Sequence, residues 1–124
     1  MNYYKTLTTI NDLIGAILVE ITGCEKDSEE IIFKCSDGKQ WKMFHLQDCC
    51  EDVYLEDVCG DVKDLINSPI LRAECVTEED YTKYGTCTWS FYKFATINGE
   101  VVLRWYGESN GYYSEKVNFM RITT

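Results

Sequence analysis

The chain has little proline, little histidine and no long hydrophobic run. Its 124 residues include one proline, Pro69, and one histidine, His45. No stretch approaches the ~20 consecutive apolar residues that a membrane span requires. The first residues, Met-Asn-Tyr-Tyr-Lys-Thr, lack the apolar core of a secretory signal. We therefore expect a soluble cytoplasmic protein that does not associate with membranes.

Cysteine is abundant, but its count does not favour a disulfide framework. The number is odd, and a chain without a secretory signal is expected in a reducing compartment, where thiols stay free. Free cysteines commonly pack as small hydrophobic residues in protein cores. We expect this role for most of the seven, which are Cys24, Cys35, Cys49, Cys50, Cys59, Cys75 and Cys87.

Basic residues are almost missing from one quarter of the chain. Residues 48–80 hold eleven Asp and Glu but only two basic residues, whereas the remaining 91 residues hold ten of each sign. The whole net charge of −9 therefore lies in this acidic segment. Such a field repels nucleic acid polymers. It is typical of a solvated face, of a surface for a basic partner, or of a cation site.

The first two thirds of the chain read as strands with one short helix. At 124 residues and 45% hydrophobic composition, we expect a single domain spanning 1–124. Apolar alternation predicts strands over 16–24, 29–35, 40–46, 52–60 and 70–76. Asp37-Gly38 predicts a hairpin turn. A short helix is predicted within 60–69, with Asp61 as its N-cap and Pro69 at its end.

The last third predicts a C-terminal three-stranded meander with strands at 86–96, 100–107 and 112–123. Asn98-Gly99 and Asn110-Gly111 are typical of type I′ hairpin turns. In the middle strand, alternation places Val101, Leu103 and Trp105 on one face and Val102, Arg104 and Tyr106 on the other. The fold class is therefore α+β, mainly antiparallel β-sheet. Long exposed strand edges also favour a homo-oligomer.

The segment His45–Asp52, "HLQDCCED", concentrates side chains that could carry chemistry. His45, Asp48, Cys49 and Cys50 are of the types that ligate zinc, but adjacent strand residues point to opposite faces and no Cys-x-x-Cys pair is present. A Cys-His nucleophile is opposed because nearby carboxylates raise a thiol pKa. The acids at 51, 52, 56 and 57 could act as acid and base or bind Mg²⁺ or Ca²⁺, and solvent exposure is the simpler reading. We predict no catalytic residue, no metal and no cofactor.

The segment Arg104–Tyr113, "RWYGESNGYY", is the predicted ligand site. A guanidinium beside aromatic faces suits a planar base and a phosphate. Polar side chains at a turn can read the edges of a base, although an ordinary hairpin would show the same Asn-Gly and cross-strand aromatics. The predicted binding residues are Arg104, Tyr106, Glu108, Ser109, Asn110, Tyr112 and Tyr113, with His45 and Asp48 at the border.

Two longer stretches carry a resemblance. "FHLQDCCEDVYLEDVCGDVKDLINSPIL" at 44–71 and "TWSFYKFATINGEVVLRWYGESNGYYSEKVNF" at 88–119 resemble a widespread family of small, uncharacterised single-domain proteins encoded mostly by phages. The resemblance implies a counter-defence context in the cytoplasm of a host cell. It supplies no site residue, because no catalytic residue is assigned in that family.

Two functional hypotheses follow, and both are non-enzymatic. In the leading one, the protein sequesters a small nucleotide-derived immune signal of the host, which requires slow release rather than a general base. In the alternative, residues 48–80 bind a basic host protein surface and inhibit that protein. A small metal-dependent hydrolase is the least favoured class.

Overall fold

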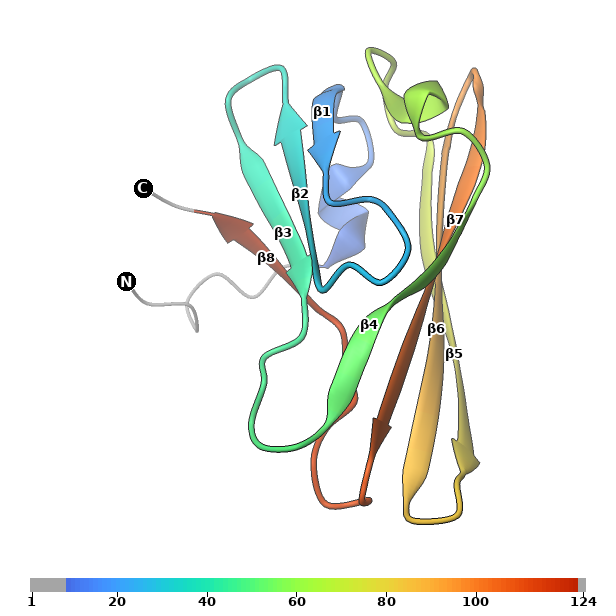
Figure 1. Ribbon diagram of the computed structural model, residues 1–124. Helices are drawn as coiled ribbons and strands as arrows, with labels where there is room; N and C mark the ends of the chain where they lie inside the picture. Colours follow the sequence, from blue (N-terminus) through green and yellow to red (C-terminus); the bar gives the residue numbers. More distant parts are fainter. Residues whose placement is uncertain (1–8, 123–124) are drawn as a thin grey trace.

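The structure, a computed structural model, describes residues 9–122. Within this range the chain forms two four-stranded antiparallel sheets, the first in the order β1-β2-β3-β8 and the second in the order β4-β7-β6-β5. Figure 1 shows the first sheet on the left, facing the second on the right. The strands are β1 Leu18–Thr22, β2 Glu30–Cys35, β3 Gln40–Phe44, β4 Asp52–Cys59, β5 Arg72–Tyr81, β6 Thr86–Thr96, β7 Gly99–Ser109 and β8 Asn118–Ile122.

Alternating apolar side chains fill the space between the sheets. In β7, Val101, Leu103 and Trp105 are all buried, which confirms the prediction that they share one face. The indole N–H of Trp105 donates to Sδ of Met43 in β3 at 3.1 Å and so joins the two sheets. Truncating a buried aromatic of this kind costs about 3–5 kcal/mol. The prediction of a mainly antiparallel β protein is confirmed.

The helix predicted within 60–69 is present only as a short 3₁₀ turn. The described residues contain two helical segments, η2 Ile10–Leu13 and η3 Val62–Leu65, and both are single 3₁₀ turns. Asp61 does cap η3 by accepting a hydrogen bond from the amide of Lys63 at 3.0 Å. The chain leaves the turn at once, because Asn67 adopts a positive φ and its amide bonds to the carbonyl of Leu18. Among residues 9–122, no helix has the length and apolar character needed to cross a bilayer.

The C-terminal meander differs from the prediction in its third strand. Strands β6 and β7 form the predicted hairpin, but the chain then leaves the second sheet and pairs with β3 as β8. Phe119 of β8 stacks on Trp41 of β3 with centroids 5.4 Å apart, and this long-range contact holds the last strand in the other sheet. The meander that forms is β5-β6-β7, because the strand expected over 70–76 continues to Tyr81.

The turns match the sequence only in part. Gly38 has a φ of +90° and its amide bonds to the carbonyl of Cys35, which confirms the hairpin turn at Asp37-Gly38. Between β6 and β7, Thr96 pairs with Gly99, so the central turn residues are one position earlier than predicted. Among the described non-glycine residues, only Asp27 and Asn67 have positive φ, which excludes the expected type I′ geometry there.

Candidate functional site

The second sheet has an outer face, turned away from the first sheet, that carries an aromatic stripe. Tyr106 of β7 lies between Tyr54 of β4 and Trp89 of β6, with ring centroids 5.9 Å and 4.5 Å away. The guanidinium of Arg104 lies over the Trp89 ring at 5.6 Å. All four side chains are half-buried. Phe91 lies opposite Arg104 in the next strand and continues the stripe.

Arg104 is neutralised by two carboxylates. Its Nε donates to Glu56 at 2.5 Å, and its outer nitrogen lies 3.5 Å from Asp57. Both acids reach it because a bulge in β4 between Leu55 and Asp57 shifts the register. The hydrogen bond that Arg104 donates to Glu56 and the nearby negative charges raise the pKa of Arg104. Regular alternation would place Glu56 and Asp57 on opposite faces, and the sequence pattern contains no signal for the bulge.

The acidic segment borders this stripe on both sides. Residues 48–80 contain β4 and all of β5 except its last residue, Tyr81, and these are the two edge strands of the same sheet. Three cations share the outer face with eight carboxylates, for a net charge of −5. The carboxylates are Asp52, Glu56, Asp57, Glu74, Glu78, Asp80, Glu100 and Glu108, and the cations are Arg72, Lys93 and Arg104. The result is an apolar centre with acidic margins.

The predicted ligand residues do not form one cluster. Arg104, Tyr106 and Glu108 lie on the outer face, where the Tyr106 hydroxyl donates to Glu108 at 3.0 Å. Ser109 has the opposite orientation and donates to Glu115 at 2.5 Å, inside the end of the sandwich. The remaining tip residues are placed differently again. Asn110 accepts a hydrogen bond from the amide of Tyr112, whose ring is 88% exposed, and Tyr113 lines two cavities.

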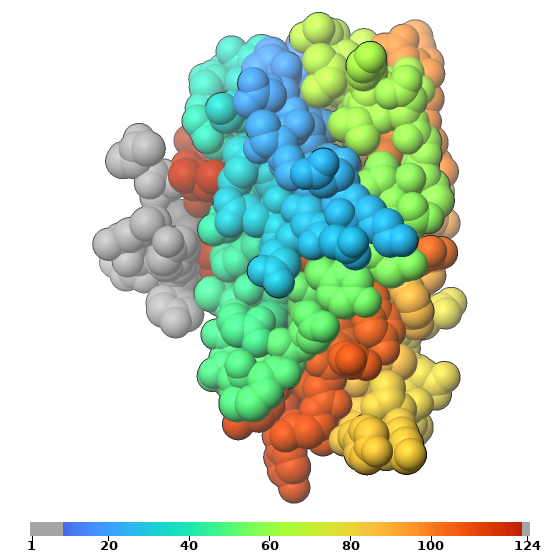
Figure 2. Space-filling view, in the orientation of Figure 1, coloured from blue at the N-terminus to red at the C-terminus, as the bar shows by residue number. Residues whose placement is uncertain are grey.

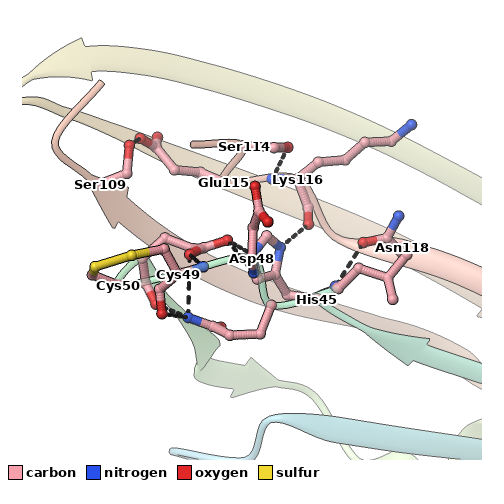
Figure 3. Close-up of polar contacts among 12 residues, drawn as sticks. His45, Asp48, Cys49, Cys50, Ser109, Ser114, Glu115, Lys116 and Asn118 are labelled. Carbon is pink, nitrogen blue, oxygen red and sulfur yellow. Dashed lines mark hydrogen bonds and ion pairs between the residues drawn. A yellow bond between two sulfur atoms is a disulfide. The ribbon is translucent and has the colours of Figure 1, made fainter. Parts of the chain in front are cut away.

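The buried side chains of His45 and Glu51 lie in contact at the end of the sandwich. Figure 3 shows the His45 ring directed at the backbone of Lys116. Nδ1 of His45 lies 2.6 Å from the carbonyl oxygen of Lys116, and Nε2 lies 2.9 Å from Glu51. A carbonyl can only accept, so Nδ1 of His45 donates to Lys116, and the Glu51 carboxylate accepts two loop amides as well. Burial by itself raises the pKa of Glu51, but the hydrogen bonds outweigh it and hold that pKa at about 2.

The loop 46–51 differs from the expectation for its cysteines. Cys49 and Cys50 are exposed rather than packed inward, and they are joined by a disulfide, whereas the other five thiols are free. Asp48 points to solvent and contributes only its amide, which donates to Glu51 at 2.9 Å. Within residues 9–122, no three of the His, Cys, Asp and Glu side chains are grouped so that they could hold a metal.

Glu115 organises a second polar cluster that the sequence prediction missed. Its carboxylate accepts hydrogen bonds from the hydroxyls of Thr86, Thr88 and Ser109 at 2.6, 2.8 and 2.5 Å. Burial raises its pKa, but the three hydroxyls outweigh burial and lower it. A signal was present, because Glu115 shares the parity of Val117, as Glu51 shares that of Val53. A charged residue in register with buried apolar positions indicates an inward carboxylate.

An elongated groove, the end groove, opens beside the Glu115 cluster. It has a volume of about 710 Å³ and runs between the inner face of β5 and β6 and the segment 113–117. A second cavity of about 420 Å³ lies nearby and is lined by Ser109, Asn110 and Tyr113 together with Lys83. Tyr113 contributes to both. His45 lines a third, smaller hollow, so it does not border the end groove.

Comparison with known proteins finds one family. A model described as a domain of unknown function, DUF7448, matches residues 11–119. The chain belongs to the DUF7448 family. The match agrees with a resemblance to an uncharacterised family and carries no information on a phage source. No curated protein matches the chain, and no solved structure matches it.

This DUF7448 domain therefore presents two surfaces on opposite sides of one sheet. The outer face offers aromatic rings, a neutralised arginine and acidic margins, which suit contact with another macromolecule. The end groove offers carboxylates, hydroxyls and tyrosines in a concave space, which suits a small molecule.

Proposed function

We propose that this protein is a non-enzymatic binding module that docks a basic protein surface on the outer face of the sheet β4-β7-β6-β5. One observation carries the proposal. The acidic segment 48–80, continuous in sequence, is divided by the fold into the two edges of one sheet, with Trp89 and Tyr106 of the central strands between them and Tyr54 of β4 beside Tyr106.

This layout has the features of a protein interface. Aromatic residues and arginine are enriched at the energetic centre of interfaces, and polar residues form the rim. Arg104 lies over Trp89 at that centre, and the carboxylates of β4 and β5 lie outside it. A net charge of −5 on the face would attract a basic partner from a distance and speed its association at low salt.

A second copy of the chain fits this face poorly, because pairing two outer faces or two β5 edges opposes carboxylates to carboxylates. A homo-oligomer formed through another surface stays a prediction, and light scattering of the purified protein tests it. A phage counter-defence role in a host cytoplasm also stays a prediction, and in that setting the basic partner would be a host protein.

Sequestration of a nucleotide-derived signal is the second candidate. The 420 Å³ cavity is lined by three of the predicted ligand residues, Ser109, Asn110 and Tyr113, together with the cation Lys83. The cavity also contains Glu51, Asp52 and Glu108, and these carboxylates oppose a phosphate. Arg104, the expected phosphate contact, does not line this cavity and already pairs with two acids.

The test is capture from a host lysate followed by mapping with purified partner. Trp89→Ala should weaken binding of the purified partner at least tenfold, as expected for an aromatic at an interface centre. The double variant Glu74→Gln/Glu78→Gln should slow association at low salt and lose this effect at high salt. Its matched control, Glu25→Gln/Glu29→Gln, removes the same charge from the exposed loop before β2 and should bind normally.

Three results would contradict the proposal. Equal losses in both double variants would mean that only the net charge matters. Full affinity in Trp89→Ala would remove the outer face as the contact. A rise in melting temperature with a nucleotide, abolished by Tyr113→Ala but not by Trp89→Ala, would favour the second candidate instead.

A further inference from the structure

The end groove exists because the second sheet is longer than the first. In Figure 1 the lower ends of β5 and β6 extend beyond the left-hand sheet. Their inner face is met there by the segment 113–117, and Figure 2 shows that segment beside the β5–β6 hairpin at the lower end of the molecule. On β5 the groove runs from Cys75 to Tyr81, a span of roughly 20 Å at the rise of an extended strand.

The charges around the groove are mostly negative. The side chain of Glu79 lies on the β5 side and that of Glu115 on the opposite wall, against the single cation Lys116 among the described lining residues. Asp80 also lines the groove, but it pairs with Cys87 and its side chain belongs to the outer face. The side chain of Glu79 falls on the inner face, because Glu79 pairs with Thr88, whose hydroxyl reaches Glu115. Tyr81, Tyr92 and Tyr113 add aromatic rings to the lining. An anion would be repelled here, whereas a cation would meet both carboxylates and ring faces.

Ser90 presents an unpaired hydroxyl to the groove. This residue is only 4% exposed, yet its hydroxyl makes no hydrogen bond to any part of the chain that the structure describes. It lies on the inner face of β6 opposite Thr77, and both line the groove. Among the described residues no buried side-chain oxygen or nitrogen lacks a partner, so the Ser90 hydroxyl is accessible from the groove and free to bond a molecule there. An ammonium group, which has only donors, fits an oxygen acceptor of this kind.

We propose that the end groove binds an elongated organic cation, an aliphatic chain that carries two or more amine groups. One ammonium group donates to Glu79 and to the Ser90 hydroxyl, another lies against the Tyr113 ring, and the alkyl chain covers the apolar parts of the wall. Glu115 adds to the negative potential, although its oxygens already accept three hydroxyls. The site is on the inner side of the sheet and does not depend on the outer-face proposal.

The probe is spermidine, titrated by calorimetry into the purified full chain. Glu79→Gln should weaken spermidine binding at least tenfold, as expected for loss of a charge-assisted hydrogen bond. The matched control is Glu78→Gln, which removes the same charge from the neighbouring residue on the outer face and should change the affinity less than twofold. Ser90→Ala should weaken binding several-fold. Tyr113→Ala should also weaken spermidine binding several-fold, whereas Tyr112→Ala, at the exposed neighbouring residue, should leave it unchanged.

Several outcomes would overturn the inference. Equal losses in Glu78→Gln and Glu79→Gln would show that spermidine responds only to the net charge. The absence of a heat signal with folded protein at millimolar spermidine would exclude the site. Binding of a nucleoside monophosphate without binding of spermidine would show that the groove takes an anion and not a cation. None of these results affects capture through the outer face, because Trp89 and β4 lie outside the groove.

Discussion

Replacing Thr88 by valine tests whether Glu115 holds the end of the sandwich together. The change is isosteric and removes only the hydroxyl that donates to Oε1 of Glu115 at 2.8 Å. A hydrogen bond to a charged group contributes about 1.5–3 kcal/mol, and the lower end applies because Thr88 is half-buried. With an unfolding entropy of about 2.1 cal/mol/K per residue over the whole chain, a loss of about 1.5 kcal/mol lowers the melting temperature by about 6 °C.

Thermal and urea unfolding of the purified variant measure this loss, and Thr77→Val is the matched control. Thr77 lines the same groove from the next strand but makes no side-chain hydrogen bond to the described residues. Its replacement should change stability by less than about 0.5 kcal/mol. Equal melting temperatures for the two variants would refute the role given to the Thr88 hydroxyl.

The stability difference between wild type and Thr88→Val should depend on pH. The pKa of Glu115 is lower in the folded protein than its ordinary value of 4.5, so its stabilising contribution is complete above that value. The contribution is lost as the pH falls through the lowered folded pKa, when the carboxyl gains a proton. The stability gap between wild type and Thr88→Val should therefore shrink in acid. A gap that stays constant from neutral pH into acid would contradict a charged acceptor.

Three further predictions follow from the same end of the molecule. Because the pKa of Glu51 in the folded protein is about 2, the stability of the wild type should fall as the pH drops from 4.5 to 2. Urea unfolding of Glu51→Gln should show a shallower fall over this range, and parallel curves for the two proteins would contradict the prediction. Alkylation in denaturant should modify five cysteines without reductant and seven with it, as counted by mass spectrometry, because only Cys49 and Cys50 are paired; seven without reductant would disprove the disulfide. Gly107→Ala should lower the free energy of unfolding by about 1–3 kcal/mol, since an added Cβ would lie 3.0 Å from Cβ of Glu115 and 3.1 Å from Val53; unchanged stability would show that the segment over β7 can move.

The split of the predicted ligand site has a local cause. Alternation assigned Arg104 and Tyr106 to one face correctly, and the structure confirms that Trp105 faces the other way. Ser109 has the parity of Trp105, so it could not share a surface with Arg104 on a continuous strand. The predicted strand ends at residue 107 and places Ser109 in a turn, whereas β7 stays regular through Ser109.

The destination of the last strand required contacts that no short window contains. Residues 112–123 show strand-like alternation, but alternation does not say which sheet a strand joins. That choice depends on Phe119 stacking on Trp41 and on Glu115 reaching Thr86, which lie 78 and 29 positions away in sequence. The bulge that brings Glu56 and Asp57 to Arg104 is equally invisible to a period of two.

From the sequence alone, the strand positions, the inward residues of β7 and the concentration of charge in residues 48–80 could be read, because each depends on neighbouring residues and a period of two. Tertiary structure alone decided that this acidic segment becomes both edges of one sheet, that the charge of Arg104 is cancelled, and that an end groove remains open. These outcomes depend on pairings across tens of residues, which form only when the burial of the whole core offsets the entropy of closing the long loops between them.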